Sequence, residues 1–117
     1  MINAAIYRTD SGRIKSFTIS GHAFYDEYGK DIVCAGVSAV SFGAINAVMA
    51  LTGVKPDIEQ GKGGFLRCVI PDNLDEDTQE KVQLLLEGMV VSLQTIERDY
   101  GEYIKITSNK AGGGTTC

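Results

Sequence analysis

The chain is poor in the residues that build metal sites and disulfide frameworks. Its 117 residues include one histidine, three cysteines and no tryptophan. Cys34, Cys68 and Cys117 are widely spaced, odd in number and form no C-x-x-C pair, which argues against a disulfide framework and against a zinc site. Because His22 is the only histidine, we expect neither a metal nor another cofactor.

Positive charge and targeting signals are also scarce. The formal net charge is −4, which argues against the clustered Lys and Arg of a nucleic-acid surface and fits a basic partner better. The N-terminus has no basic lead and no signal-type apolar core, so we expect a reduced cytoplasmic protein. The uncharged run at 32–54 is long enough to cross a bilayer. Its small and polar residues favour a helix packed inside a soluble domain, and we expect no membrane association.

The length fits a single domain, which we expect to span residues 1–109, followed by a flexible glycine-rich tail at 110–117. Glycines in the segment 61–64 are followed by a strand pattern and lack a G-K-[ST] ending, which predicts a hairpin turn and not a phosphate loop. Apolar–polar alternation and β-branched or aromatic residues predict five strands, at residues 2–8, 14–20, 57–60, 65–70 and 103–107.

Two helices are predicted between these strands. Asp31 is a good N-cap and Gly53 a natural stop for a helix at 32–52, which is apolar nearly all round and therefore expected to be buried. Asp77 begins a sequence that resembles a capping box, ahead of a second helix at 78–100. The predicted core stripe of the second helix is Val82, Leu86, Met89, Leu93, Ile96 and Tyr100.

The order of elements is ββαββαβ, which is typical of an α+β fold with a mainly antiparallel sheet and helices on one or both faces. Leu84 and Val91 lie seven residues apart on the side of the second helix opposite its core stripe. That side is either sandwiched within the fold or in contact with a second subunit. The acidic run at 72–80 complements the start of the helix, and a docking surface for a basic protein is its alternative.

The strongest candidates for catalytic residues are Cys34 and His22. Cys34 falls in the first turn of the predicted helix at 32–52, where unpaired N–H groups and the helix dipole favour a thiolate. A thiolate with one imidazole nearby is the minimum equipment for nucleophilic acyl transfer. The plainer interpretation is a core cysteine and a solvent-facing histidine. A strand that stays regular to its end turns His22 away from the core, unless Gly21 bends the chain.

Two neighbours share a helix face with Cys34. Ser38 either hydrogen-bonds near the nucleophile or bonds its own backbone. Asp31 either orients His22 or caps the helix by accepting N–H bonds from Val33 or Cys34, and a carboxylate beside a thiolate also opposes thiolate formation.

The other two cysteines are weaker candidates. Cys68 alternates with Leu66 and Ile70 and is expected to be a buried strand residue. Cys117 ends the predicted tail, where its thiol would be unperturbed.

Two motifs of this chain carry a family resemblance. A Gly-His-Ala block at 21–23 is followed by a D-I-V-C-A-G-V-S block at 31–38. Together they closely resemble the ribosomal-processing cysteine protease family of Firmicutes and related bacteria, the Prp or YsxB-like proteins. The resemblance covers residues 1–107, and only the glycine-rich tail looks foreign to the pattern.

The resemblance implies a homodimeric cytoplasmic endopeptidase that acts through a thioester intermediate. Its substrate would be the N-terminal extension of ribosomal protein twenty-seven of the large subunit, cut after a hydrophobic segment that ends in two phenylalanines. By the match, Cys34 is the nucleophile and His22 the base of a Cys–His dyad. Gly21, Asp31 and Ser38 fall on motif positions with supporting roles.

The chemistry of the residues agrees with this assignment. The loop at 23–30 would cover the substrate, with Phe24, Tyr25 and Tyr28 as apolar walls. N–H groups at the start of the following helix would stabilise the oxyanion. One alternative is a non-catalytic ribosome-assembly factor that binds a basic ribosomal protein. Another is a redox-sensing thiol protein, for which Cys68 is the available resolving cysteine.

Overall fold

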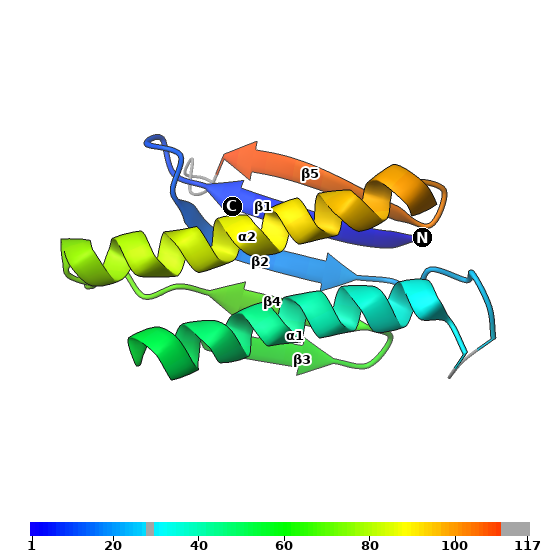
Figure 1. The fold of residues 1–117 in the computed structure, drawn as a ribbon, viewed down its shortest axis with the longest axis horizontal. Helices are drawn as coiled ribbons and strands as arrows, with labels where there is room; N and C mark the ends of the chain where they lie inside the picture. The colour runs from blue at the N-terminus through cyan, green and yellow to red at the C-terminus, as the bar shows by residue number, and fades with distance from the viewer. Residues whose placement is uncertain (28–29, 111–117) are drawn as a thin grey trace.

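The computed structural model describes residues 1–27 and 30–110 (Figure 1). The described chain has the predicted order ββαββαβ, so the α+β fold class is confirmed. The elements are β1 (Ile2–Arg8), β2 (Ile14–Ser20), α1 (Ile32–Thr52), β3 (Asp57–Gly61), β4 (Phe65–Val69), α2 (Glu76–Tyr100) and β5 (Ile104–Lys110).

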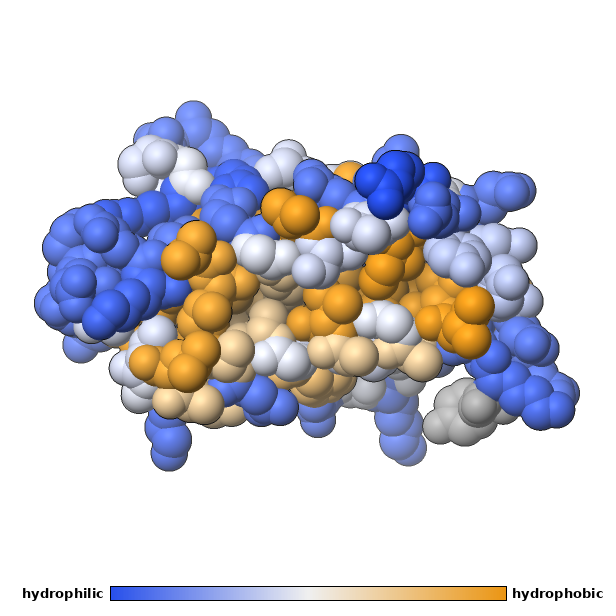
Figure 2. Space-filling model, viewed as in Figure 1, coloured by the Kyte–Doolittle hydropathy of each residue, from blue (hydrophilic) through white to orange (hydrophobic). Residues whose placement is uncertain are grey.

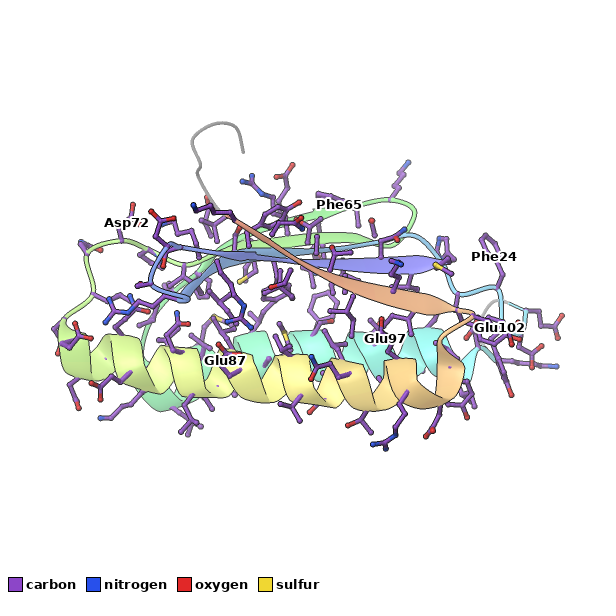
Figure 3. The ribbon with its side chains drawn as sticks, turned by 90° about the horizontal axis from the view of Figure 1, so that it is seen from above. Phe24, Phe65, Asp72, Glu87, Glu97 and Glu102 are labelled. Carbon is purple, nitrogen blue, oxygen red and sulfur yellow. The ribbon has the colours of Figure 1, made fainter. Side chains whose placement is uncertain are left out.

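The strands form a five-stranded sheet of order β3-β4-β2-β1-β5. The pairs β1–β2, β2–β4 and β3–β4 are antiparallel, whereas β5 runs parallel to β1, because α2 crosses over the sheet between β4 and β5. The sheet is therefore mixed but mainly antiparallel. Both helices cover the same face of it, as the view from above shows (Figure 3). The sequence left open whether the helices cover one face of the sheet or both, and in the structure they cover one.

The core lies between the sheet and the two helices. Phe17 from β2 and Ile6 from β1 are almost fully buried there, opposite Leu86 and Leu93 from α2. The predicted stripe of α2 is confirmed, since Val82, Leu86, Met89 and Leu93 are buried and Ile96 and Tyr100 pack against the core. Val90 is also buried, although the sequence analysis did not include it.

The expected burial of α1 on all sides is wrong. Its buried residues form one stripe, Val33, Val37, Ser41, Ile45 and Val48. The helix packs against the sheet and α2 only, so its outer side leaves Ile32 and Leu51 56% and 70% exposed. Figure 2 shows hydrophobic side chains across this helical face. By length and composition alone, α1 could also cross a membrane; in this structure one stripe of it packs into the core.

Predicted boundaries shift in four elements, α2, β3, β4 and β5. The helix α2 begins at Glu76 with Asp75 as its N-cap, so the capping box at Asp77 is wrong, and Asp77 pairs with Lys81 at 3.1 Å on the helix surface. β3 and β4 end at Gly61 and Val69, each one residue from its predicted end. β5 continues beyond 107 because it pairs with β1 along its whole length. Lys110 is its last residue and not part of the tail. The rest of the predicted tail lies outside the described residues.

Candidate active site

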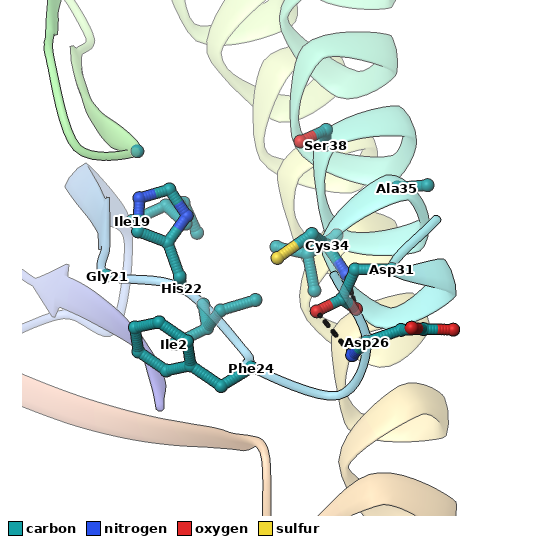
Figure 4. Close-up of a pocket in the computed structure, with 12 residues that line it drawn as sticks. Ile2, Ile19, Gly21, His22, Phe24, Asp26, Asp31, Cys34, Ala35 and Ser38 are labelled. Carbon is teal, nitrogen blue, oxygen red and sulfur yellow. Dashed lines mark hydrogen bonds between the residues drawn. The ribbon is translucent and has the colours of Figure 1, made fainter. Parts of the chain in front are cut away.

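A pocket of about 610 Å³ opens where the end of β2, the start of α1 and the β3–β4 turn meet (Figure 4). It lies at the end of the molecule that carries Phe24, opposite the end with Asp72 (Figure 3). Among its lining residues are six that the sequence analysis singled out, Gly21, His22, Phe24, Asp31, Cys34 and Ser38.

His22 reaches this pocket because the chain bends at Gly21. Gly21 has a φ of +88°, and a Cβ at this position would lie 2.4 Å from the carbonyl oxygen of Met1. Only glycine combines this backbone conformation with such a close approach. The bend ends the alternation of β2, so that His22 lines the pocket instead of following the open face of the sheet.

Cys34 lies at the opposite wall, as the third residue of α1, and is half-buried. Its Sγ accepts a hydrogen bond from the backbone N–H of Ala23 at 3.3 Å. In Figure 4 the sulfur points to the side of the pocket that carries His22. Within residues 1–27 and 30–110, no direct hydrogen bond joins the two side chains, and the imidazole packs edge-on against Phe24 with ring centroids 5.9 Å apart.

Asp31 is the hydrogen-bond hub between α1 and the loop before it. Oδ1 accepts the N–H groups of Val33 and Cys34, each at 3.0 Å, which confirms the predicted cap. Oδ2 accepts those of Tyr25 at 2.9 Å and Asp26 at 3.4 Å. Both oxygens are thus occupied by backbone donors, and among the described residues neither contacts an imidazole nitrogen. Of the two roles that the sequence left open for Asp31, the structure shows the capping of α1.

These donors also set the charge state of Asp31. Burial of the carboxyl group raises its pKa, because burial disfavours the charged form. The four backbone N–H bonds lower it by more, so the pKa of Asp31 lies below its ordinary value of 3.8. Asp31 is therefore a carboxylate at neutral pH.

The aromatic residues of the loop at 23–30 were all predicted to be walls of the substrate site, but the two that the structure describes have different roles. Phe24 lines the pocket, is 77% exposed and has a φ of +57°. Tyr25 is not a pocket wall; its ring packs edge-on against Tyr100 and Tyr103, with centroids 5.6 and 5.1 Å apart. It anchors the loop to the end of α2. Tyr28 lies outside the described residues.

Ser38 is exposed on the same face of α1 as Cys34. In the described part of the chain its hydroxyl bonds neither the cysteine nor the helix backbone. Ser38 lies between the main pocket and a second hollow of about 220 Å³, whose walls include Phe42 and Phe65. The two hollows share the lining residues Ile19, Val37, Ser38 and Gly64, so they lie next to each other along α1.

Several lining residues were missed by the sequence analysis. Ile2, Ile19 and Val37 read as ordinary core residues of a strand or a helix, and Gly64 as a turn residue. Their part in the pocket depends on how four separate segments meet, which no local pattern signals.

Cys68 lies apart from this chemistry. It is 1% exposed on β4, as predicted, and lines neither hollow. Desolvation, with a smaller contribution from the charge of Asp57, raises the pKa of its thiol to about 12. Cys34 and Cys68 are both free thiols. The described residues contain no group of three or more His, Cys, Asp or Glu side chains arranged to hold a metal ion.

Comparison with known proteins matches this chain to proteases over nearly its whole length. The sequence model of the family described as cysteine protease Prp matches residues 1–105. The ribosomal processing cysteine protease Prp of Bacillus subtilis is 49% identical over 110 residues, which cover 93% of this chain and 98% of that protein. The protein of the same name from Staphylococcus aureus is 43% identical over 109 residues, covering 91% and 97%.

Two solved structures of the Staphylococcus aureus protease are similar to this fold. The complex with a covalently linked product peptide has a TM-score of 0.84 and 44% identity. The complex with a substrate peptide has a TM-score of 0.79 and 40% identity. Each match covers 93% of this chain and 100% of the other.

Proposed function

Because this chain belongs to the Prp family of cysteine proteases, we propose that Cys34 and His22 form the dyad with which it processes a ribosomal protein precursor. The chain is a hydrolase of the cysteine peptidase class. The observation that carries the proposal is that its half-buried cysteine and its single histidine line opposite walls of one pocket.

In the proposed reaction, the Cys34 thiolate attacks the scissile carbonyl carbon, and the C–N bond of the tetrahedral intermediate then breaks. His22 accepts the thiol proton and donates it to the leaving amine. The resulting thioester is hydrolysed by water, which His22 activates as a base. No hydrogen bond between the two side chains is needed in the free enzyme, since such bonds often tighten only when substrate is bound.

Fewer backbone N–H groups are available to stabilise the oxyanion than the sequence predicted. The N–H groups of Val33 and Cys34 are already donated to Asp31, and that of Ala35 to the Asp31 carbonyl. The N–H of Ala23, beside Sγ, is the backbone donor that we assign to the thiolate and then to the oxyanion. Asp31 holds both the helix start and the loop in place for this chemistry.

For the substrate, we propose the N-terminal extension of ribosomal protein twenty-seven of the large subunit, cut after its two phenylalanines. The relatives' name and their peptide complexes support a ribosomal peptide substrate. The apolar walls Ile2, Ile19 and Val37 suit a hydrophobic segment. The adjoining hollow beside Phe42 and Phe65 offers a second apolar seat for a neighbouring side chain.

We further propose that the enzyme is a cytoplasmic homodimer that needs no cofactor and binds neither nucleic acid nor membrane. Its reaction requires a reduced cysteine, and both described cysteines are free. Exposed apolar side chains on the helical face, such as Leu84 at 75% and Val91 at 60%, support self-association.

The test is mass spectrometry of the purified ribosomal protein precursor after incubation with wild-type enzyme, Cys34→Ala or Cys34→Ser. Wild-type enzyme should remove the extension at one site, and both variants should be at least about 10³-fold slower, since they lack the thiolate. Replacing the two phenylalanines by alanine should abolish cleavage. Wild-type enzyme that binds the precursor and leaves it intact would contradict the proposal and favour a non-catalytic assembly factor.

A further inference from the structure

We propose that Gly64, in the turn between β3 and β4, is a positioning residue that fixes the location of His22. The inference rests on the proposed function, in which His22 is the base. Gly64 lies 42 positions after His22 in the sequence, yet both residues line the same pocket. In Figure 4 the β3–β4 turn approaches the imidazole ring from the side away from α1.

The contact between the turn and the histidine segment leaves no room for a side chain at Gly64. A Cβ at this position would lie 2.6 Å from the carbonyl oxygen of Gly21 and 3.4 Å from Cε1 of His22. The first contact is with backbone, which cannot rotate out of the way as the end of a flexible side chain can. One residue of the turn therefore lies next to both the bend that redirects the chain and the imidazole ring of His22.

Gly21 is held from a second direction as well. Its own Cα lies so close to β1 that a Cβ there would be 2.4 Å from the carbonyl oxygen of Met1. The bend is thus confined by the start of β1 through its Cα and by Gly64 through its carbonyl. Because His22 is attached directly to this confined residue, its backbone position depends on both contacts.

Turn geometry alone does not explain Gly64. Gly63 and Gly64 have nearly the same left-handed backbone, with φ values of +76° and +77°, so either would be strained by a side chain. A Cβ at Gly63, however, would meet nothing within 4 Å. The turn thus contains its own control: both positions need glycine for conformation, and only Gly64 needs it for the approach to His22.

The experiment compares Gly64→Ala with Gly63→Ala. Relief of the 2.6 Å contact to an ordinary 3.4 Å requires Gly21 and the turn to move apart by about 0.8 Å. A misplacement of this size near a reacting group lowers activity on the order of 10²-fold. We expect that loss in kcat for Gly64→Ala, and a change of less than about 3-fold for Gly63→Ala, while thermal unfolding shows that both are folded and similarly strained.

A spectroscopic measurement separates positioning from general damage. Because His22 is the only histidine, its imidazole signals in a heteronuclear NMR spectrum are unambiguous. They should move in Gly64→Ala and keep their wild-type positions in Gly63→Ala. In the wild-type protein, an Hα of Gly64 should show a nuclear Overhauser effect to Hε1 of His22, which needs no variant to fold.

The outcomes are distinguishable from failure of the proposed function. Absence of the Overhauser effect, or a folded Gly64→Ala enzyme with wild-type kcat and unchanged imidazole signals, would overturn the positioning role while proteolysis stands. Equal losses of activity in the two glycine variants would also overturn it. A wild-type protein that cleaves nothing but shows the Overhauser effect and the selective shift would refute the proposed function and leave the contact established.

Discussion

The backbone N–H of Ala23 donates to Sγ of Cys34 across 3.3 Å, and this hydrogen bond joins the segment that carries His22 to the start of α1. Ala23 is itself buried, at 3% exposure, so the bond is shielded from bulk water. This sulfur lines an open pocket, so it is better placed to meet a reagent or a substrate than a sulfur in an apolar core. The relationship links the two halves of the proposed dyad through the residue between them.

The two described thiols should therefore differ in reactivity. In a Cys117→Ser background, iodoacetamide at neutral pH should modify Cys34 faster than Cys68, since the thiol of Cys68 is 1% exposed and its pKa is raised to about 12. Peptide mass spectrometry of a time course measures both rates in one sample. A Cys34 that reacts no faster than in a denatured control would contradict its proposed role as nucleophile.

His22 should matter for turnover and little for stability. Its ring is partly exposed and packs on the exposed ring of Phe24, so His22→Ala should change the free energy of unfolding by less than about 1 kcal/mol. Turnover should fall by roughly 10² or more. Phe24→Ala serves as a control that removes the ring contact and keeps the imidazole. Loss of activity that simply tracks unfolding of His22→Ala would argue against a base.

Asp31 combines a cap with a loop anchor, and substitution can separate the two. Asn is a good N-cap, so Asp31→Asn should retain the bonds to Val33 and Cys34, whereas its NH₂ group cannot accept the N–H groups of Tyr25 and Asp26. Hydrogen exchange should rise in the loop and stay low in α1. Asp31→Ala should lose both functions, with the missing cap alone costing about 1 kcal/mol. Equal exchange in the loop of wild type and Asp31→Asn would contradict the anchor.

The same residue predicts a pH dependence of stability. Its pKa is lower in the folded protein than the ordinary value of 3.8, so folding favours the carboxylate. The stability advantage of wild type over Asp31→Asn should therefore be complete above the unfolded pKa. It should be lost as the pH falls through the lower, folded pKa. Urea unfolding of both proteins between pH 2 and about pH 6 measures the difference. An advantage that persists unchanged at the acidic end would contradict the lowered pKa.

The outer face of α2 should contribute to the proposed dimer. Leu84 is 75% exposed on this face, so Leu84→Glu should shift sedimentation toward monomer if the face is buried between subunits. Gln94→Glu adds the same charge at an exposed polar position of the same helix and should leave the assembly unchanged. A dimer that survives Leu84→Glu and dissociates with Leu51→Glu would place the interface on α1 instead. A wild-type protein that sediments as a monomer would contradict the proposed homodimer.

Sequence by itself determined much of the local structure. Asp31 and Gly53 marked both ends of α1, because capping and a left-handed stop are properties of a few adjacent residues. The core stripe of α2 followed from its periodicity. The Gly-His-Ala block at 21–23 and the D-I-V-C-A-G-V-S block at 31–38 together identified the family, since the residues of each block are contiguous.

Tertiary structure decided what depends on distant segments. Polar alternation along β2 predicted that His22 points away from the core unless Gly21 bends the chain. Only the tertiary structure decided between these alternatives: the chain bends at Gly21, which packs closely against Met1 and Gly64, and His22 lines the pocket. Likewise, the three aromatic residues predicted as pocket walls looked equivalent in the sequence. In the structure, however, the ring of Tyr25 packs against Tyr100 and Tyr103 at the end of α2. Local preference fixes the elements that form, whereas close approach between backbones from different elements fixes where a side chain points.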